Sequence, residues 1–448
     1  MSKKVYIETY GCQMNLADTE IVLGTLNKID YSPTNDPNEA DLILVNTCSV
    51  RENAEQRVFG RLSLLKRYKK NNPNVLIGVL GCMAERLKKD LIEKEKAVDL
   101  IVGPDEYRNL PQYIEEAHNG GKGIGVRLSR VETYEDIIPY REEGISAWIS
   151  IMRGCDKFCS FCIVPFTRGR ERSRKLESII NEINSLSERG FKEVTLLGQN
   201  VNCYKDGEYD FADLLSACAK VDPEMRIRFT TSHPQDISLK LLETISSHHN
   251  ICKYLHLPVQ SGSNRILELM NRNYTIEHYL NIIEQAKKLI PNLALTTDII
   301  VGFPTETFED HIMTIEVMQK VRYDGAYMFI YSPREGTKSY KMKDDAPYEI
   351  KNKRLNEIID LQNKISLEIN STLVGKEEIV LIEGDSKKSD KYFSGKTDSN
   401  KVVVMPKTED VKIGEYVKVK INRATSATLF GDIVEKKLSL SQTLAKTA

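Results

Sequence analysis

Three cysteines near the middle of the chain constrain the protein more than any other feature. Cys155, Cys159 and Cys162 follow a short apolar run with the spacing C-x3-C-x2-C. Thiolates this close together on one loop can bind three irons of a cubane iron–sulfur cluster, and no fourth cysteine follows in the run. One iron then keeps a free position for a substrate or cofactor, so the spacing indicates a catalytic cluster.

Other uses of three neighbouring cysteines fit the sequence less well. Structural zinc sites close four ligands and usually combine two ligand pairs, and redox-active thiols are a further alternative. Disulfides need an oxidising compartment, whereas the chain enters a strand-like run at Val5 without a secretory signal. We interpret its nine cysteines as reduced thiols and metal ligands. We expect a soluble, cytoplasmic protein that does not cross a membrane.

Length and sequence pattern predict three domains. The 448 residues suffice for about three domains of roughly 150 residues each. Apolar strands alternate with amphipathic helices over residues 1–135, which predicts an α/β domain with a parallel sheet. Residues 144–372 repeat a strand–helix unit six times, as in a partial (β/α)6 barrel. Residues 373–438 are typical of a small, OB-like, all-β barrel. Its predicted strands are 378–382, 401–405, 416–421 and 429–434.

Three further cysteines follow predicted strands of the N-terminal domain. Cys12, Cys48 and Cys82 come just after the apolar runs 5–10, 41–46 and 75–80. The carboxyl ends of parallel strands meet at one edge of a sheet, where ligands bind. Gly11 and Gly81 permit the close backbone approach that a bulky cluster needs. Buried, inert cysteines are the alternative, but three equivalent positions favour a second three-cysteine iron–sulfur cluster.

The chain resembles the radical S-adenosylmethionine (SAM) enzymes, whose signature is C-x3-C-x2-C directly after a strand. The resemblance implies that the amino and carboxylate groups of SAM bind the open iron. It also implies that SAM is cleaved reductively, giving methionine and a 5′-deoxyadenosyl radical. The protein then has to hold the cofactor, orient its reactive atom and exclude side reactions.

Polar residues at the ends of the barrel strands are candidates to bind SAM, because they lie on the same side as the cluster loop. A strand-end hydrogen bond is an equal alternative for each of them, and a histidine here is more typical of a packed structural residue. In the cluster loop, Phe161 is a candidate to contact the adenine of SAM through its backbone. The candidates are Phe161, Gln199, Ser232, His256, Gln260 and Asp298.

A basic segment after the cluster loop indicates local contact with nucleic acid, since the net charge of −1 excludes a general basic surface. The alternative is that Ser173 caps the next helix and that the arginines pair with acidic residues. The C-terminal barrel is only slightly basic, and we prefer RNA contact over a plain capping role for it. The candidates to bind an RNA phosphate backbone are Arg168, Arg170, Arg172 and Arg174.

The three parts in this order resemble the methylthiotransferase family of radical SAM enzymes over nearly the whole chain. The matching runs are YGCQMN at 10–15, NTCSVR at 46–51, GC at 81–82 and RGC at 153–155, and the last domain resembles the TRAM RNA-binding module. The resemblance implies two [4Fe-4S] clusters, one that binds SAM and an auxiliary one. The cysteines at 12, 48 and 82 then hold the auxiliary cluster.

Two further runs, 164–170 and 197–202, resemble the branch of the family that modifies tRNA. This implies methylthiolation at C2 of N(6)-dimethylallyladenosine at position 37, next to the anticodon. One SAM then methylates a sulfur at the auxiliary cluster, and a second SAM gives the radical that abstracts hydrogen. We further expect a sulfur source, an electron donor such as a flavodoxin, and a monomer.

Three alternative functions stay open at this point. Sister enzymes methylthiolate another modified adenosine, such as threonylcarbamoyladenosine, or an aspartate of a ribosomal protein. The basic segment and the residues Gln13 to Asn15 argue against the protein-directed sister. A non-catalytic iron–sulfur protein that binds RNA and senses iron or redox state is the alternative from another class.

Overall fold

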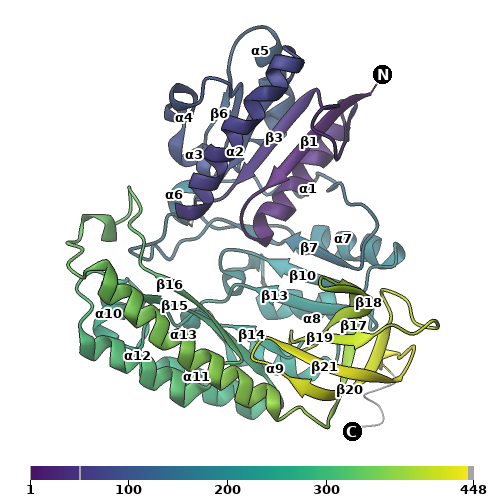
Figure 1. The fold of residues 1–448 in the computed structure, drawn as a ribbon, viewed down its shortest axis with the longest axis vertical. Coiled ribbons are helices and arrows are strands. Elements are labelled where there is room, and N and C mark those ends of the chain that lie inside the picture. Colours follow the sequence, from purple (N-terminus) through teal and green to yellow (C-terminus); the bar gives the residue numbers. More distant parts are fainter. Residues whose placement is uncertain (1, 50–51, 442–448) are drawn as a thin grey trace.

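The computed structural model describes residues 2–49 and 52–441 and shows three parts (Figure 1). Val50 and Arg51, which belong to one of the matching runs, lie outside the described residues. The N-terminal sheet is parallel, with the order β2-β1-β3-β4-β5-β6. Its strands are β1 (Lys3–Thr9), β2 (Tyr31–Pro33), β3 (Leu42–Thr47), β4 (Leu76–Gly81), β5 (Leu100–Val102) and β6 (Gly123–Gly125). The predicted parallel sheet is confirmed, and the short edge strands β2 and β6 were not predicted.

Helices cover both faces of this sheet, which explains why β3 and β4 are almost entirely apolar. Every residue of β3 is buried, as expected for a strand between two helical layers. Leu42 and Leu44 pack on the side of α1 and α5, and Ile43 and Val45 pack on the side of α2. The helices are α1 (Gln13–Asn27), α2 (Glu52–Asn71), α3 (Cys82–Leu87), α4 (Lys89–Lys94) and α5 (Leu110–His118).

The middle part is a barrel of six parallel strands that stays open between its edge strands. One sheet has the order β13-β10-β7 and the other β14-β15-β16, and a bridge from Ile227 to Ile251 joins them. The strands are β7 (Ser146–Ser150), β10 (Glu193–Leu197), β13 (Arg226–Thr230), β14 (Tyr254–His256), β15 (Ala294–Val301) and β16 (Gly325–Ile330). The open edges are therefore β7 and β16.

Helices cover the outside of the barrel, and small elements shape its loops. Strands β8 (Met152–Arg153) and β9 (Arg172–Ser173) pair around the cluster loop, and β11 (Lys205–Asp206) pairs with β12 (Tyr209–Asp210). The long helix α13 leads to the C-terminal part. The helices are α6 (Val164–Thr167), α7 (Leu176–Glu188), α8 (Phe211–Val221), α9 (Leu239–Ser247), α10 (Asn264–Leu269), α11 (Ile276–Leu289), α12 (Phe308–Val321) and α13 (Tyr348–Ser371).

The C-terminal part is a closed five-stranded barrel, which confirms the predicted small all-β barrel. We predicted four strands, and the structure adds β18, whose polar sequence SDKYFSGKT hides its β pattern. Strands β19 and β21 pair in parallel, so the barrel is not purely antiparallel. The strands are β17 (Glu377–Ser386), β18 (Ser389–Thr397), β19 (Val402–Pro406), β20 (Tyr416–Ala424) and β21 (Thr428–Glu435). No helix within the described ranges is long and apolar enough to span a membrane.

Two arginines of β13 attach the C-terminal barrel to the amino end of the central barrel. Arg226 donates hydrogen bonds to the carbonyls of Lys396 and Ile379, at 2.7 and 2.9 Å. Arg228 donates to the carbonyls of two neighbouring residues, Thr397 and Asp398, at 2.7 Å each. These bonds to backbone atoms fix the positions of β17 and β18 without requiring particular side chains there.

We predict that Arg228→Met destabilises the joined barrels by about 3–5 kcal/mol, because it leaves the carboxylate of Glu193 buried without its partner. The two side chains form an ion pair at 2.7 Å and expose 6% and 4% of their surface. Unfolding in guanidinium chloride measures the change. Lys240→Met, which removes a half-exposed ion pair with Asp210, is the control. Equal stability of the two variants would contradict the prediction.

Candidate active site

Cys12, Cys48 and Cys82 lie at the carboxyl ends of three adjacent strands, β1, β3 and β4. The register pairs Thr47 with Gly81, so Cys48 and Cys82 follow directly opposite positions. The register of β1 and β3 pairs Thr9 with Asn46, so Cys12 follows the same edge of the sheet. The structure therefore brings the three thiols to one edge of the sheet, as the sequence predicted from their equivalent positions.

Gly11 and Gly81 allow the strand ends themselves to approach one another. A Cβ atom on Gly81, whose φ is +90°, would lie 2.4 Å from the carbonyl oxygen of Thr47. A Cβ atom on Gly11 would lie 2.9 Å from the Cβ of Cys48. We predicted that these glycines make room for a cluster. The structure adds a second reason, because the space beside Gly81 is filled by the end of β3 and the space beside Gly11 is filled by Asn15 and Cys48.

Asn15 fixes the turn that carries Cys12 against the end of β3. Its side-chain oxygen accepts a hydrogen bond from the Cys12 N–H at 3.2 Å. Its amide nitrogen donates to the carbonyl of Thr47 at 3.0 Å, and the Asn46 side chain donates back to the Asn15 carbonyl at 2.8 Å. These residues belong to the runs YGCQMN and NTCSVR, so the two runs form one structural unit.

The cysteines of the second set share one loop, in which the Cys162 N–H donates a hydrogen bond to the Cys159 carbonyl at 3.0 Å. Burial raises the pKa of Cys155 and of Cys162 to about 12 each. Such thiols become thiolates only beside a strong positive charge, which iron supplies. Arg272 donates a hydrogen bond from Nη1 to the sulfur of Cys159 at 3.3 Å. The donor set therefore fits an iron–sulfur cluster.

No three His, Cys, Asp or Glu side chains in the described part of the chain converge on the position of one metal ion. A mononuclear zinc site brings four ligands around one ion, whereas a cubane binds each thiolate to a different iron. The preference for a cluster rests on the spacing C-x3-C-x2-C.

Buried polar atoms without partners lie around the second cysteine loop. Among the described residues, no partner is found for Ser160 Oγ, Asn200 Oδ1, Ser232 Oγ or His233 Nε2. Each of these side chains is more than nine-tenths buried. Burial, together with nearby positive charge, lowers the pKa of His233 to about 2, so its ring is neutral. Buried polar groups normally have partners, and this set therefore fits a polar ligand such as SAM.

The residues predicted to bind SAM make contacts within the protein, and a purely structural role at the end of a strand explains these contacts equally well. Gln199 accepts a hydrogen bond from the Gly154 N–H at 2.6 Å and so shapes the cysteine loop. His256 contacts Thr296 Oγ1 at 3.0 Å and Asp298 at 3.5 Å. The buried Gln260 has a φ of +67°, and its N–H donates to the Asp298 carbonyl at 2.9 Å. Phe161 packs against Ile266, Met270, Phe303 and Tyr331. Their roles toward SAM stay predictions.

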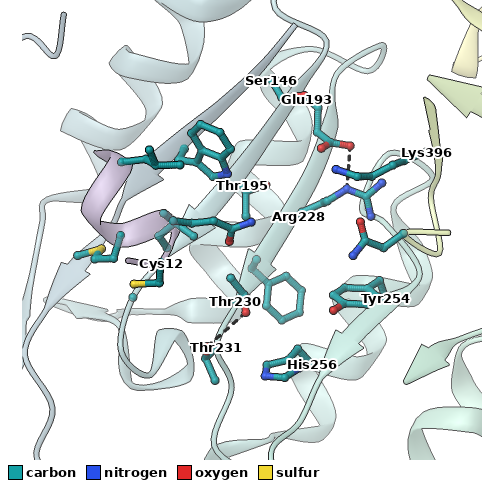
Figure 2. A pocket seen from close by; sticks show the side chains of 18 of the residues that line it. Cys12, Ser146, Glu193, Thr195, Arg228, Thr230, Thr231, Tyr254, His256 and Lys396 are labelled. Carbon is teal, nitrogen blue, oxygen red and sulfur yellow. Dashed lines mark hydrogen bonds and ion pairs between the residues drawn. The ribbon is translucent and has the colours of Figure 1, made fainter. Parts of the chain in front are cut away.

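A cavity of about 900 Å³ lies between the three parts of the chain. Figure 2 shows Cys12 on one side of it and Lys396, from the C-terminal barrel, on the opposite side. Gly198 lies in the cavity wall, and the next residue, Gln199, accepts a hydrogen bond from the Gly154 N–H at the start of the second cysteine loop. The central barrel contributes most of the wall: Ser146, Trp148, Glu193, Thr195, Leu197, Gly198, Arg228, Phe229, Thr230, Thr231, Tyr254, His256 and Tyr327.

The cavity wall includes aromatic residues that we did not predict as site residues. Trp148, Thr195 and Arg228 lie in register across β7, β10 and β13. Trp148 belongs to the alternating sequence SAWIS, in which Ala147 and Ile149 are buried on the other face. The alternation of this sequence could therefore have identified Trp148 as an inward-facing residue. The row that Trp148 forms with Thr195 and Arg228 could not be identified, because it depends on the register of three strands.

Three of the four arginines predicted to bind RNA are buried. Arg168 and Arg172 pair with acidic residues of the N-terminal domain, and Arg174 pairs with one of the central barrel. Arg168, Arg172 and Arg174 expose 4%, 6% and 7% of their surface. Each forms an ion pair, and these pairs are Arg168–Asp18 at 2.7 Å, Arg172–Asp105 at 2.7 Å and Arg174–Glu182 at 2.6 Å. The prediction of RNA contact is wrong for these three in this structure, because side chains inside the protein do not reach a phosphate backbone.

Arg170 is the member of the predicted set that is exposed. Its side chain exposes 62% of its surface, and its guanidinium lies 4.9 Å from the centroid of the Phe158 ring. An exposed aromatic ring with an arginine is a surface on which RNA bases stack. The role of Arg170 toward RNA stays a prediction.

Comparison with known proteins agrees with this geometry. Family models match residues 4–103 (Uncharacterized protein family UPF0004), 149–318 (Radical SAM superfamily) and 371–434 (TRAM domain). The tRNA-2-methylthio-N(6)-dimethylallyladenosine synthase of Chloroherpeton thalassium is 52% identical over 432 residues, which cover 96% of each chain. The protein of the same name from Parabacteroides distasonis is 52% identical over 441 residues, covering 97% of this chain and 96% of its own.

A solved structure shows similarity of the fold alone. It is the radical SAM methyltransferase TsrM from Kitasatospora setae, with cobalamin and a [4Fe-4S] cluster bound. Its sequence is 13% identical, and the two structures align with a TM-score of 0.57 over 84% of this chain and 79% of that chain. The chain belongs to the family of the tRNA-2-methylthio-N(6)-dimethylallyladenosine synthases, which are radical SAM enzymes.

We predict that replacing Cys12, Cys48 and Cys82 together by alanine removes roughly half of the iron from anaerobically reconstituted protein. The variant should still cleave SAM, because the loop of Cys155 is unchanged. Iron and sulfide analysis, with chromatography of 5′-deoxyadenosine, measures both properties. The matched control is the variant in which the cysteines of that loop are replaced instead. An unchanged iron content in the first variant would mean that the N-terminal domain holds no cluster.

Proposed function

We propose that the protein transfers a methylthio group to C2 of N(6)-dimethylallyladenosine at position 37 of tRNA, with two SAM and two [4Fe-4S] clusters. The observation that carries the proposal is the cavity, which has Cys12 in its wall and the strand ends of the central barrel beside it. The synthases that are about 50% identical over their full length support the same substrate.

The two cysteine sets supply different chemistry to the same cavity. When bound, the clusters and SAM supply sulfur and a methyl group on the side of Cys12, and a hydrogen-abstracting radical beside the loop of Cys155. The carbon at C2 of adenine is unactivated, so its C–H bond and the incoming sulfur have to be held close together. The residues of the cavity wall perform that task by binding and orienting one base between the two sites.

Aromatic side chains of the central barrel are suited to bind the base. Trp148 on β7 and Tyr327 on β16 belong to the two edge strands, so they flank the opening of the barrel. Tyr254 and Phe229 lie in the wall between them. Bases of single-stranded RNA loops are bound by stacking on such rings, and a base has to leave its stack to enter an enclosed site.

The C-terminal barrel completes the cavity on the side away from Cys12. Lys396 and Asn400 line it, and the Lys396 ammonium pairs with Glu383 at 3.0 Å. A lysine at this position suits the sugar–phosphate backbone next to the bound base. The bonds from Arg226 and Arg228 hold this side in place, so the C-terminal barrel acts both as an RNA-binding module and as a wall of the site.

Other partners follow from the chemistry. An external electron donor, such as a flavodoxin, is needed to reduce the cluster before SAM is cleaved. A separate sulfur source is needed because each product carries away one sulfur atom. We propose that the protein acts in the cytoplasm as a monomer.

We predict that the reconstituted protein, with SAM, a reductant and tRNA that contains N(6)-dimethylallyladenosine, forms the 2-methylthio nucleoside. Mass spectrometry of the digested tRNA measures the product. A methylthio group on threonylcarbamoyladenosine, or on a ribosomal protein, would contradict the substrate and support a sister enzyme. Bound RNA without formation of 5′-deoxyadenosine would support the iron–sulfur sensor instead.

We predict that an anticodon stem-loop containing N(6)-dimethylallyladenosine quenches the fluorescence of Trp148, which is the only tryptophan of the chain. Tyr327→Leu should weaken binding by about tenfold, because a stacked base contributes about 1–3 kcal/mol. The matched control is Tyr209→Leu, since both tyrosines expose 54% of their surface and Tyr209 lies away from the cavity wall. Unchanged fluorescence with saturating RNA would place the base elsewhere.

A further inference from the structure

A buried group of charges joins the N-terminal domain to the central barrel. Asp18 of α1 pairs with Arg153 at 2.8 Å and with Arg168 at 2.7 Å. The side chains of Asp18, Arg153 and Arg168 expose 0%, 1% and 5% of their surface. One carboxylate therefore holds two arginines that come from different segments of the barrel.

This group lies between the two sets of cysteines. Asp18 is on the helix that begins directly after Cys12, and Arg153 stands two residues before Cys155. Arg168 follows α6, which packs against α3, the helix that begins at Cys82. The positive charge of Arg168 interacts with the sulfurs of both Cys82 and Cys12. Arg168 is therefore a barrel residue placed at the edge of the auxiliary site.

One nitrogen of the Arg168 guanidinium has no hydrogen-bond acceptor among the residues that the structure describes. Its Nη2 donates to Asp18, whereas its buried Nη1 has no acceptor anywhere in residues 2–49 and 52–441. A buried donor without an acceptor is costly, and a charged donor is more so. The Cys82 side chain, at the start of α3, is buried beside the Arg168 guanidinium. A sulfur atom of this site is therefore the acceptor that Nη1 requires.

We infer that Arg168 donates a hydrogen bond from Nη1 to a sulfur of the auxiliary iron–sulfur site, either the Cys82 thiolate or a neighbouring sulfide. Asp18 holds the guanidinium in this position. The inference rests on the proposed role of Cys12, Cys48 and Cys82 as cluster ligands. Hydrogen bonds to cluster sulfurs tune the reduction potential. A cationic donor stabilises the reduced cluster, which carries more negative charge, so Arg168 raises the potential of the auxiliary cluster.

Arg172 provides a comparison within the same interface. It exposes 6% of its surface and pairs with Asp105 at 2.7 Å, much as Arg168 pairs with Asp18. Its other nitrogens donate to the carbonyls of Glu132 and Ser129, at 3.0 and 2.8 Å. Arg172 is thus satisfied by protein atoms, and its substitution should loosen the interface without touching a cluster sulfur.

The test is a redox titration of the auxiliary cluster, followed by electron paramagnetic resonance. The parent is the full chain with Cys155, Cys159 and Cys162 replaced by alanine, so that only the auxiliary cluster gives a signal. Arg168→Gln should shift the midpoint potential to a more negative value. Arg172→Gln should leave the potential unchanged, although it removes an equally buried ion pair.

Arg168→Lys keeps the positive charge and the partner Asp18 but removes the second N–H donor group of the guanidinium. The midpoint potential should again become more negative, by less than in Arg168→Gln. This variant replaces Arg168→Gln in the test if the glutamine variant does not fold. An unchanged potential in both variants, with the cluster present, would overturn this inference alone. A parent that binds no iron would overturn it together with the assignment of the auxiliary ligands.

Discussion

The buried contact of Asp18 with Arg153 and Arg168 is the interaction on which the relative position of the two sites depends. Each cysteine set sits at the carboxyl end of its own sheet, and nothing within either domain fixes the distance between them. A carboxylate shared by two arginines does so together with the Arg172–Asp105 pair of the same interface, because breaking either contact would leave charges buried without partners. Asp18 is close in sequence to Cys12, and Arg153 is close to Cys155. The contact therefore also fixes the position of the two cysteine sets relative to each other.

The cavity follows from this arrangement and from the open edge of the barrel. A closed barrel would fill its interior with apolar side chains, whereas here the inner row of β7, β10 and β13 includes Trp148, Thr195 and Arg228. The N-terminal domain covers one end of this interior, and the C-terminal barrel covers the other through bonds to its backbone. Three domains are needed because no single one of them encloses the space that the reaction requires.

Much of the fold was predictable from periodicity, since β3 and β4 are continuous apolar runs between helices and the barrel units repeat. Polar β18 was not, because its pairing depends on neighbouring strands rather than on its own pattern. The two cysteine sets were predictable from spacing and from equivalent strand ends. The arginines after the cluster loop were misjudged, because a sequence shows their charge but not the acids, such as Asp18 and Asp105, that approach them from another domain.

The two cysteine sets lie beside one cavity. Electron paramagnetic resonance of the reduced protein with both clusters, compared with the two variants that each retain one cysteine set, shows whether the clusters are close to each other. Two paramagnetic clusters across one cavity relax each other, so the spectrum and relaxation rates of the complete protein should differ from the sum of the variants. A spectrum equal to that sum would show that the two sites are too far apart to act on one base.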